Sequence, residues 1–115
     1  MKEDKSFKLN GRIWIESDSG RLLGPGRVEL LERIKASGSI RQAALQMEMS
    51  YRQAWDLVED MNKQMEMPVV ISHRGGKGGG NAIVTEQGEK AIEQFYILQK
   101  KFQKFLKLNS SKIQF

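Results

Sequence analysis

The sequence predicts a mainly α-helical fold with a small β component, and three observations support this prediction. Three consecutive segments carry apolar residues at helical spacing, and the last two are almost contiguous. Two short β-branched segments follow, joined by a glycine-rich loop, and a long amphipathic segment comes after them. Together with short N-terminal strands, these elements have the order of a winged helix-turn-helix fold with a β-hairpin wing and a long C-terminal helix.

The composition describes a single domain with a basic excess. The chain has 115 residues, 39% hydrophobic and 29% charged, which is enough for one modest core. There is no cysteine and only one histidine, His73, so disulfides are excluded and neither a metal site nor a cofactor is expected. The net charge of +5 favours a polyanionic partner such as nucleic acid.

The N-terminal segment carries no targeting signal. Residues 1–6 are polar and charged and are expected to be disordered, and no apolar run is long enough to span a bilayer. These features predict a cytoplasmic protein without a membrane partner. The apolar residues that follow alternate as in a half-buried strand, and they are Phe7, Leu9, Ile13 and Ile15. Residues 18–20 are a turn signal, after which residues 21–23 return as a second short strand.

Two helix-start signals lie close together in the middle of the chain. A first helix is predicted over residues 27–37 and ends at Gly38. Ser39 begins a second helix of about nine residues, and Ser50 begins a third that ends before Pro68. Each serine is followed three residues later by a glutamine, the capping-box pattern that satisfies free backbone N–H groups. Because so short a turn cannot place the two helices antiparallel, the third must project, as a helix that enters a major groove does.

The start of this third helix is the first candidate contact with DNA. Ser50, Arg52 and Gln53 lie off its apolar face, whereas the later part of the helix is acidic and would repel phosphate. Arginine can bond guanine, and glutamine can bond adenine, through two hydrogen bonds each, and a helix N-terminus favours phosphate. The alternative is that these side chains form an ordinary solvated helix face.

The glycine-rich loop is the second candidate contact. Residues 69–73 and 82–85 are predicted to be paired strands, and the loop between them is basic. Since glycines let a backbone approach phosphate or the minor groove, the predicted contacts are Arg41, Tyr51, Arg74, Gly76, Lys77 and Gly78. A nucleotide phosphate cradle would need a different spacing of glycine and lysine and a helix after the loop. A hairpin tip without a ligand is the other alternative.

The aromatic rings of the third helix, and the rest of the chain, suggest no catalytic site. Tyr51 and Trp55 fall on the apolar face, so core packing is predicted for both rings in preference to stacking on bases. The Tyr51 hydroxyl is still close enough to the helix start to reach a phosphate. No Ser–His–acid group, carboxylate pair or metal-ligand cluster stands out, so no enzyme is predicted.

The last helix is predicted over about residues 86–108, with Thr85 as its cap. Apolar residues recur along it at alternating spacings of four and three, and they are Ala91, Phe95, Leu98, Phe102 and Phe105. One interpretation packs this seam on its own domain. The favoured one pairs the helix with a second copy of the chain, because the apolar surface is large for so small a domain. The residues predicted to dimerise are Phe95, Leu98, Phe102, Phe105 and Leu106.

Five segments match a known family in order. They are Gly26-Arg27-Val28-Glu29-Leu30-Leu31, Gly38-Ser39-Ile40-Arg41-Gln42-Ala43-Ala44, Ser50-Tyr51-Arg52-Gln53-Ala54-Trp55, Gly75-Gly76-Lys77-Gly78-Gly79-Gly80 and Val84-Thr85-Glu86-Gln87-Gly88. In this order they resemble the N-terminal DNA-binding domain of the ModE family of molybdate-responsive transcriptional regulators, over about residues 9–105. The resemblance implies a LysR-like winged helix-turn-helix, binding to double-stranded DNA, and dimerisation through helices outside the DNA-reading unit.

Three departures from the family pattern bear on this interpretation. Glu48 stands where the turn between the helices usually has glycine, and a positive φ there would cost glutamate roughly 1 kcal/mol or more. Asn81 replaces a further glycine after the loop, where asparagine tolerates left-handed geometry. The chain also stops soon after the last helix, so it is expected to be a short stand-alone member without the molybdate-binding domains and without a molybdate site.

These observations predict a dimeric, sequence-specific regulator of transcription that binds double-stranded DNA. Two alternatives from other classes remain open. The first is a protein-interaction module on the same scaffold, which salt-dependent binding to duplex DNA would distinguish. The second, less favoured, is a nucleotide-binding enzyme.

Overall fold

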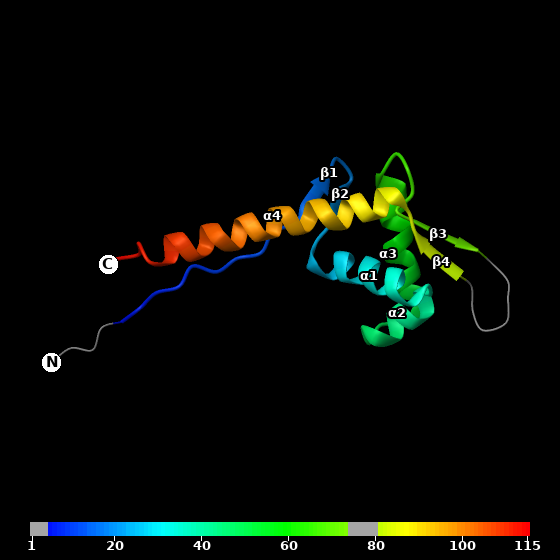
Figure 1. The fold of residues 1–115 in the computed structure, drawn as a ribbon, viewed down its shortest axis with the longest axis horizontal. Helices are drawn as coiled ribbons and strands as arrows, with labels where there is room; N and C mark the ends of the chain where they lie inside the picture. The colour runs from blue at the N-terminus through cyan, green and yellow to red at the C-terminus, as the bar shows by residue number, and fades with distance from the viewer. Residues whose placement is uncertain (1–4, 74–80) are drawn as a thin grey trace.

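Most of the chain folds into one head, from which a single helix extends (Figure 1). The structure, a computed structural model, describes residues 5–73 and 81–115. Its elements follow the order β1, β2, α1, α2, α3, β3, β4, α4, and the molecule measures 69 × 29 × 21 Å. We call residues 94–110 of α4 the stem and residues 5–14, which run beside it, the arm. The described residues from 15 to 93 form the head.

Helix α1, Pro25–Ser37, lies at the centre of the head and confirms the first predicted helix. Proline in its first turn suits a helix start, where its missing N–H would have no partner. Gly38 ends the helix with a left-handed φ of 71° and donates its N–H to the Ile34 carbonyl. Its buried side chains belong to one continuous core with Leu23, Ala54, Met61, Val69 and Phe95.

Helices α2, Ile40–Gln46, and α3, Tyr51–Gln64, confirm the predicted helix pair. The hydroxyl of each N-cap, Ser39 and Ser50, accepts a hydrogen bond from the backbone N–H three residues later, which is the serine half of each predicted capping box. The glutamine half does not form in the described residues, and the Ser39 N–H donates to the Ser37 hydroxyl instead. Helix α2 has 7 residues, fewer than its apolar pattern indicated. Three alanines of the two helices are fully buried, and such small side chains let helices approach closely: Ala43, Ala44 and Ala54.

A residue in the left-handed region makes the turn between α2 and α3. Glu48 has a φ of 55° and is the one non-glycine residue with positive φ among the residues described. The turn is tied to α2, because the Met49 N–H donates to the Ala44 carbonyl at 3.0 Å. The strained backbone expected from a glutamate in place of glycine is therefore present.

Strands β3, Val70–His73, and β4, Asn81–Val84, form the predicted antiparallel hairpin. Asn62 of α3 holds its base, since the side-chain amide donates to the Val70 carbonyl at 3.0 Å and accepts from the Val70 N–H at 3.3 Å. On the other edge, an N–H of β4 donates to the Gly38 carbonyl at 2.8 Å. The hairpin is thus held between α1 and α3.

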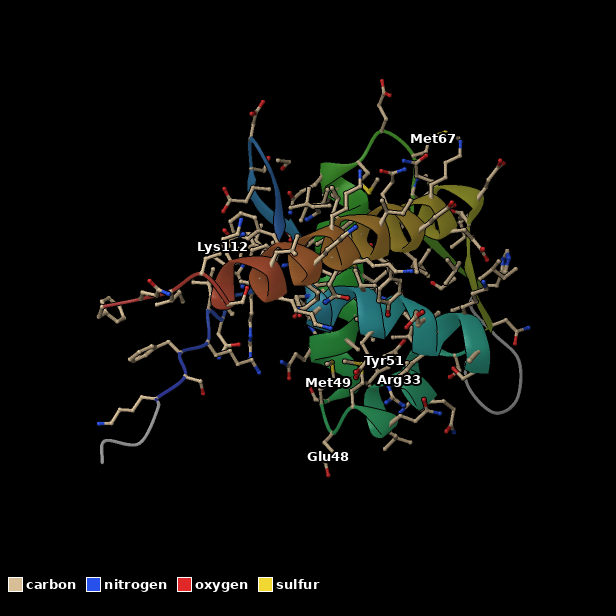
Figure 2. The ribbon with its side chains drawn as sticks, turned by 60° about the vertical axis from the view of Figure 1, so that its left-hand side comes forward. Arg33, Glu48, Met49, Tyr51, Met67 and Lys112 are labelled. Atoms are coloured by element: carbon tan, nitrogen blue, oxygen red, sulfur yellow. The ribbon has the colours of Figure 1, made fainter. Side chains whose placement is uncertain are left out.

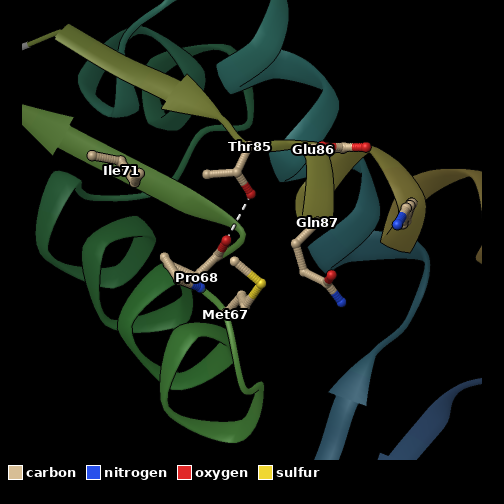
Figure 3. A pocket seen from close by; sticks show the side chains of 7 residues that line it. Met67, Pro68, Ile71, Thr85, Glu86 and Gln87 are labelled. Atoms are coloured by element: carbon tan, nitrogen blue, oxygen red, sulfur yellow. Dashed lines mark hydrogen bonds between the residues drawn. The ribbon is translucent and has the colours of Figure 1, made fainter.

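The start of α4, Glu86–Ser110, is locked against the base of the hairpin (Figure 3). The Thr85 hydroxyl accepts from the Gly88 N–H at 3.1 Å and donates to the Pro68 carbonyl at 2.6 Å. A Cβ atom on Gly88 would lie 2.3 Å from the Val69 carbonyl oxygen, so only glycine fits this contact. The direction of the long helix is therefore set at its first turn.

The predicted N-terminal strand is wrong over most of its length. Strand β1, Ile15–Ser17, pairs with β2, Gly20–Leu23, but residues 5–14 belong to no strand. Residues 1–4, which were expected to be disordered with residues 5 and 6, lie outside the described residues. An alternating apolar pattern does not say what covers the side chains. Here Leu9 lies against α4, Ile13 and Ile15 pack on the core of the head, and Phe7 is 45% exposed.

The arm instead follows the stem in the opposite direction (Figure 1). The Leu9 N–H donates to the Ser110 hydroxyl at 2.8 Å. Gly11 faces the Phe102 ring, whose nearest atom would lie 3.0 Å from an added Cβ. These contacts cover one side of a helix that leaves the head, and they bury Leu106 to 7% exposure.

An ion pair joins the start of α1 to the end of α3. The Arg27 guanidinium donates to the Asp60 carboxylate at 2.6 Å, and Gln64 donates to the same carboxylate at 2.9 Å. The hydrogen bond from Arg27 is the main reason why the pKa of Asp60 lies below its ordinary value. The pair therefore fixes α3 against α1 at the end farther from the α2–α3 turn.

Glu48→Gly should raise the free energy of unfolding by roughly 0.5–1 kcal/mol, since glycine relieves the left-handed strain but adds backbone entropy to the unfolded chain. Urea denaturation of both proteins measures the change. Gly38→Ala is the matched control, because alanine introduces the same strain at a φ of 71° and should destabilise. Unchanged or lower stability of Glu48→Gly would contradict the strained turn.

Candidate nucleic-acid interface

The turn and the start of α3 lie on the side of the head remote from α4. Figure 2 shows Glu48, Met49 and Tyr51 at this end of the head, with Met67 at the opposite end. The helix turn that carries the side chains singled out for base contact therefore lies at the end of the head remote from α4. Nothing else in the described chain covers this end of α3, since Tyr51, Arg52 and Gln53 are all exposed.

Arg52, one of the candidate base-contacting residues, is widely exposed. Its side chain is 82% exposed and makes an ion pair with Asp56 one turn later, at 3.2 Å between Nε and Oδ1. Its guanidinium also lies 5.9 Å from the centre of the Trp55 ring. The ion pair holds the Arg52 side chain along the helix. An exposed ion pair of this kind is weak, so a more strongly binding group can displace Asp56 from the guanidinium.

Arg41 and Tyr51 connect α2 to the first turn of α3. The Arg41 guanidinium carbon lies 4.6 Å from the centre of the Tyr51 ring, within the range of a cation–π interaction. This stacking places a cation beside the phenol and beside the free N–H groups of the helix start. Five of the predicted contact residues are thus brought together: Arg41, Ser50, Tyr51, Arg52 and Gln53.

The prediction that Tyr51 and Trp55 pack in the core is wrong. The two residues are 43% and 36% exposed, and the buried residues of α3 are Ala54, Val58 and Met61. The buried stripe follows a spacing of four and three, so the apolar face that the sequence suggested was too wide. Ala54 of the first turn is fully buried between the two rings in sequence, so the rings lie off the buried face of α3, which leaves both available at the interface.

The predicted wing contacts cannot be placed in the same way. Arg74, Gly76, Lys77 and Gly78 belong to residues 74–80, which lie outside the described residues. The flanking residues His73 and Asn81 are paired in the hairpin register, so the loop begins and ends at the tip of the β3–β4 hairpin.

The charges of the molecule are unevenly distributed, which the sequence analysis did not recognise. Every charged side chain in residues 5–12 and 94–115 is cationic: Lys5, Lys8, Arg12, Lys100, Lys101, Lys104, Lys107 and Lys112. The head carries most of the acidic residues, including Asp56, Glu59 and Asp60 on α3. The basic excess therefore lies mainly on the arm and the stem, and only the start of α3 offers a DNA phosphate a favourable approach within that helix.

The residues predicted to dimerise are divided between two environments. Phe95 is fully buried in the core of its own chain, and Leu106 is covered by the arm, so neither offers a surface to a partner. Phe102 is partly buried beside Gly11. Leu98 and Phe105 are 42% and 54% exposed, and they remain the open part of the predicted seam.

The described residues show no other kind of site. Within residues 5–73 and 81–115, no three His, Cys, Asp or Glu residues are grouped so that they could hold a metal ion. In the same residues, no helix has the length and apolar character needed to cross a membrane.

Known proteins resemble this chain over the same region. No family model matches it. It is 34% identical over 95 residues to the molybdenum transport protein ModE of Azotobacter vinelandii, which covers 83% of this chain and 35% of that protein. It is 42% identical over 93 residues to the transcriptional regulator ModE of Yersinia pestis, covering 81% and 32% of the two chains. With the DNA-binding transcriptional dual regulator ModE of Escherichia coli, the identity is 42% over 74 residues, 64% of this chain and 28% of the relative.

Solved structures with the same fold are regulators of the LysR type. One LysR family transcriptional regulator superposes with a TM-score of 0.53 at 15% identity, over 70% of this chain and 26% of its own. Full-length LysG from Corynebacterium glutamicum, with bound effector Arg, gives a TM-score of 0.55 at 21% identity, over 79% and 30% of the two chains. At these identities the likeness concerns the fold alone.

The fold and the exposed start of α3 together define this chain as a winged helix-turn-helix domain. This chain is a homologue of the N-terminal region of the ModE transcriptional regulators, of whose length it spans about a third.

Proposed function

We propose that this chain binds double-stranded DNA in a sequence-specific manner, regulates transcription in the cytoplasm and is not an enzyme. The observation that supports this most strongly is the first turn of α3, which is capped by Ser50, carries Arg52 and Gln53, and is exposed on the side remote from α4. In this proposal the first turn enters the major groove, where Arg52 and Gln53 bond base edges. The ModE relatives, described as transcriptional regulators, point the same way.

Phosphate contacts would surround this central contact. The Arg41–Tyr51 pair stands beside the helix start, so the guanidinium and the phenol can both reach the backbone of one strand. Arg74 and Lys77, with the backbone of Gly76 and Gly78, are proposed to contact phosphate or the minor groove from the wing. Such contacts set register and orientation, whereas the base contacts of α3 set sequence preference.

We also propose that the regulator is a homodimer formed through the outer face of α4. Four large apolar residues on this face are at least two-fifths exposed: Ile97, Leu98, Phe105 and Leu108. We call them the outer stripe. Helical geometry places them on a different face of α4 from Phe95 and Leu106, which are covered within the chain. An exposed apolar stripe of this length is typical of a surface that meets a partner helix.

The charges beside the outer stripe favour an antiparallel pair of stems. Along one flank, Glu86 and Glu93 come first, and Lys100 and Lys104 follow in the second half of the helix. Parallel helices would place lysines against lysines. Antiparallel pairing along the whole of α4 places the lysines of one copy against Glu86 and Glu93 of the other, which precede the stem, about a two-fold axis.

Arg52→Ala should weaken binding to the preferred duplex by about 1–3 kcal/mol and relax the preference at one base position. Binding-site selection from random DNA identifies the duplex, and titrations with single-base variants measure the preference. Lys63→Ala, in the last turn of the same helix, removes an equal charge and should leave the preference intact. If a folded Arg52→Ala protein keeps both affinity and preference, Arg52 does not read bases.

Lys77→Ala should weaken binding to all duplex sequences by a similar factor and make the salt dependence shallower by about one unit of slope. The reason is that a phosphate contact releases counterions but carries no sequence information. Titrations at several salt concentrations, on specific and random duplexes, measure both effects. A loss confined to one DNA sequence would show instead that Lys77 reads bases.

Leu98→Glu combined with Phe105→Glu should give monomers that keep their helix content and bind DNA far more weakly, because charges in the outer stripe prevent stem pairing. Sedimentation and circular dichroism measure the two properties. Met67→Glu, at a still more exposed apolar residue on the head, is the control that should remain dimeric. A wild-type protein that is monomeric at micromolar concentration and binds half-sites as well as paired sites would contradict the dimer.

A further inference from the structure

The arm and the stem enclose a cleft on a different face of α4 from the outer stripe. It has a volume of about 380 Å³, within the range of small-molecule sites. Its walls come from arm residues Lys8, Leu9 and Asn10 and from stem residues Gln103, Leu106 and Lys107. Two segments that are about a hundred positions apart in sequence thus share one concave surface.

The walls of the cleft carry cationic and amide groups but no anionic group. Lys8 and Lys107 supply ammonium groups, Asn10 and Gln103 supply amides, and no carboxylate lines the cleft. Within the described part of the chain, none of these four side chains has a hydrogen bond or an ion pair. The hydroxyl of Ser110, the last lining residue, already has two hydrogen-bond partners within the chain: it accepts from the Leu9 N–H and donates to the Leu106 carbonyl. The free donors of the cleft therefore exceed its free acceptors.

The surroundings of the cleft strengthen its preference for anions. The nearest acidic residues along the described sequence are Glu16 beyond the arm and Glu93 before the stem. Between these limits all charged side chains are cationic, and a concave surface concentrates the resulting positive potential. Leu9, which is partly exposed, supplies most of an apolar wall beside the ammonium groups, and Leu106, at 7% exposure, adds only its edge. An inorganic anion would leave that wall unused, whereas an organic anion would cover it.

We infer that this cleft is a binding site for a small organic anion, with a carboxylate or similar group between Lys8 and Lys107 and an apolar body against Leu9 and Leu106. Asn10 and Gln103 can orient the anionic group through their amide N–H donors. Because the ligand touches both the arm and the stem, its binding holds the arm in place. The site does not depend on the proposed contact with DNA.

Nuclear magnetic resonance on the full chain tests this site with three probes: 2-naphthoate, its neutral analogue 2-naphthylmethanol, and inorganic phosphate. We expect 2-naphthoate to bind saturably and to shift the amide signals of Leu9, Asn10, Gln103 and Lys107. Lys8→Gln combined with Lys107→Gln should weaken this binding by about tenfold or more, since two charge-assisted contacts are lost. Lys100→Gln combined with Lys101→Gln removes the same charge from the stem outside the cleft and should change the affinity much less.

Each other outcome would overturn the inference. Equal binding of 2-naphthylmethanol would mean an apolar cleft without anion preference, and equal binding of phosphate at the same residues would mean an inorganic anion site. If the Lys8/Lys107 variant and the Lys100/Lys101 variant lose affinity for 2-naphthoate by the same factor, the anion is attracted by the overall positive charge of the stem and not by the cleft. Contacts between Gly11 and the Phe102 ring, observed as nuclear Overhauser effects, show whether the arm stays docked in the variants. If the Lys8 and Lys107 variant detaches the arm, Asn10→Ala with Gln103→Ala should weaken 2-naphthoate binding, and an unchanged affinity there would overturn the site.

Discussion

The short connection between α2 and α3, residues 47–50, is the constraint on which the rest of the functional surface depends. It can be this short only because Glu48 adopts a positive φ, at a cost of about 1–2 kcal/mol for a residue other than glycine. The buried alanines of the two helices allow the close crossing that offsets this strain. With the crossing set, the first turn of α3 must project beyond the core. Arg52, Gln53 and the Arg41–Tyr51 pair are then presented together.

The uneven charge of the molecule gives the head and the stem different roles. A basic composition suggests nucleic acid, yet the net positive charge lies mainly on the arm and the stem, away from the start of α3, because acidic residues balance the cations of the head. In the head, a few well-placed groups and the partial charge of a helix N-terminus must attract phosphate beside an acidic helix. The cations of the stem lie too far from the start of α3 to take part in the proposed DNA contact of the head. Antiparallel pairing accounts for those beside the outer stripe, and the arm–stem cleft accounts for Lys8 and Lys107.

How far a local pattern predicts the site is clear from particular residues. Both N-caps were predictable, because a serine hydroxyl and an N–H three residues away need nothing beyond their own helix. The exposure of Tyr51 and Trp55 was not, because an apolar periodicity cannot tell how wide a face of the helix the core covers, and here it covers only the stripe of Ala54, Val58 and Met61. The prediction that Phe95 takes part in dimerisation was wrong because the ring is buried within its own chain. It fits the seam by spacing, but the head occupies its side of α4, so the ring belongs to the core.

The sequence by itself determined the elements whose causes are local: the capped helix starts, the end of α1 at Gly38, the hairpin and the approximate length of α4. Those depend on hydrogen bonds and backbone preferences within a few residues. Only the tertiary structure decided which face of each element is covered. It placed the arm on the stem instead of in a sheet, and it divided the apolar residues of α4 between the core and the surface. Burial is a property of three-dimensional neighbours, which for Leu9 and Ser110 come from opposite ends of the chain.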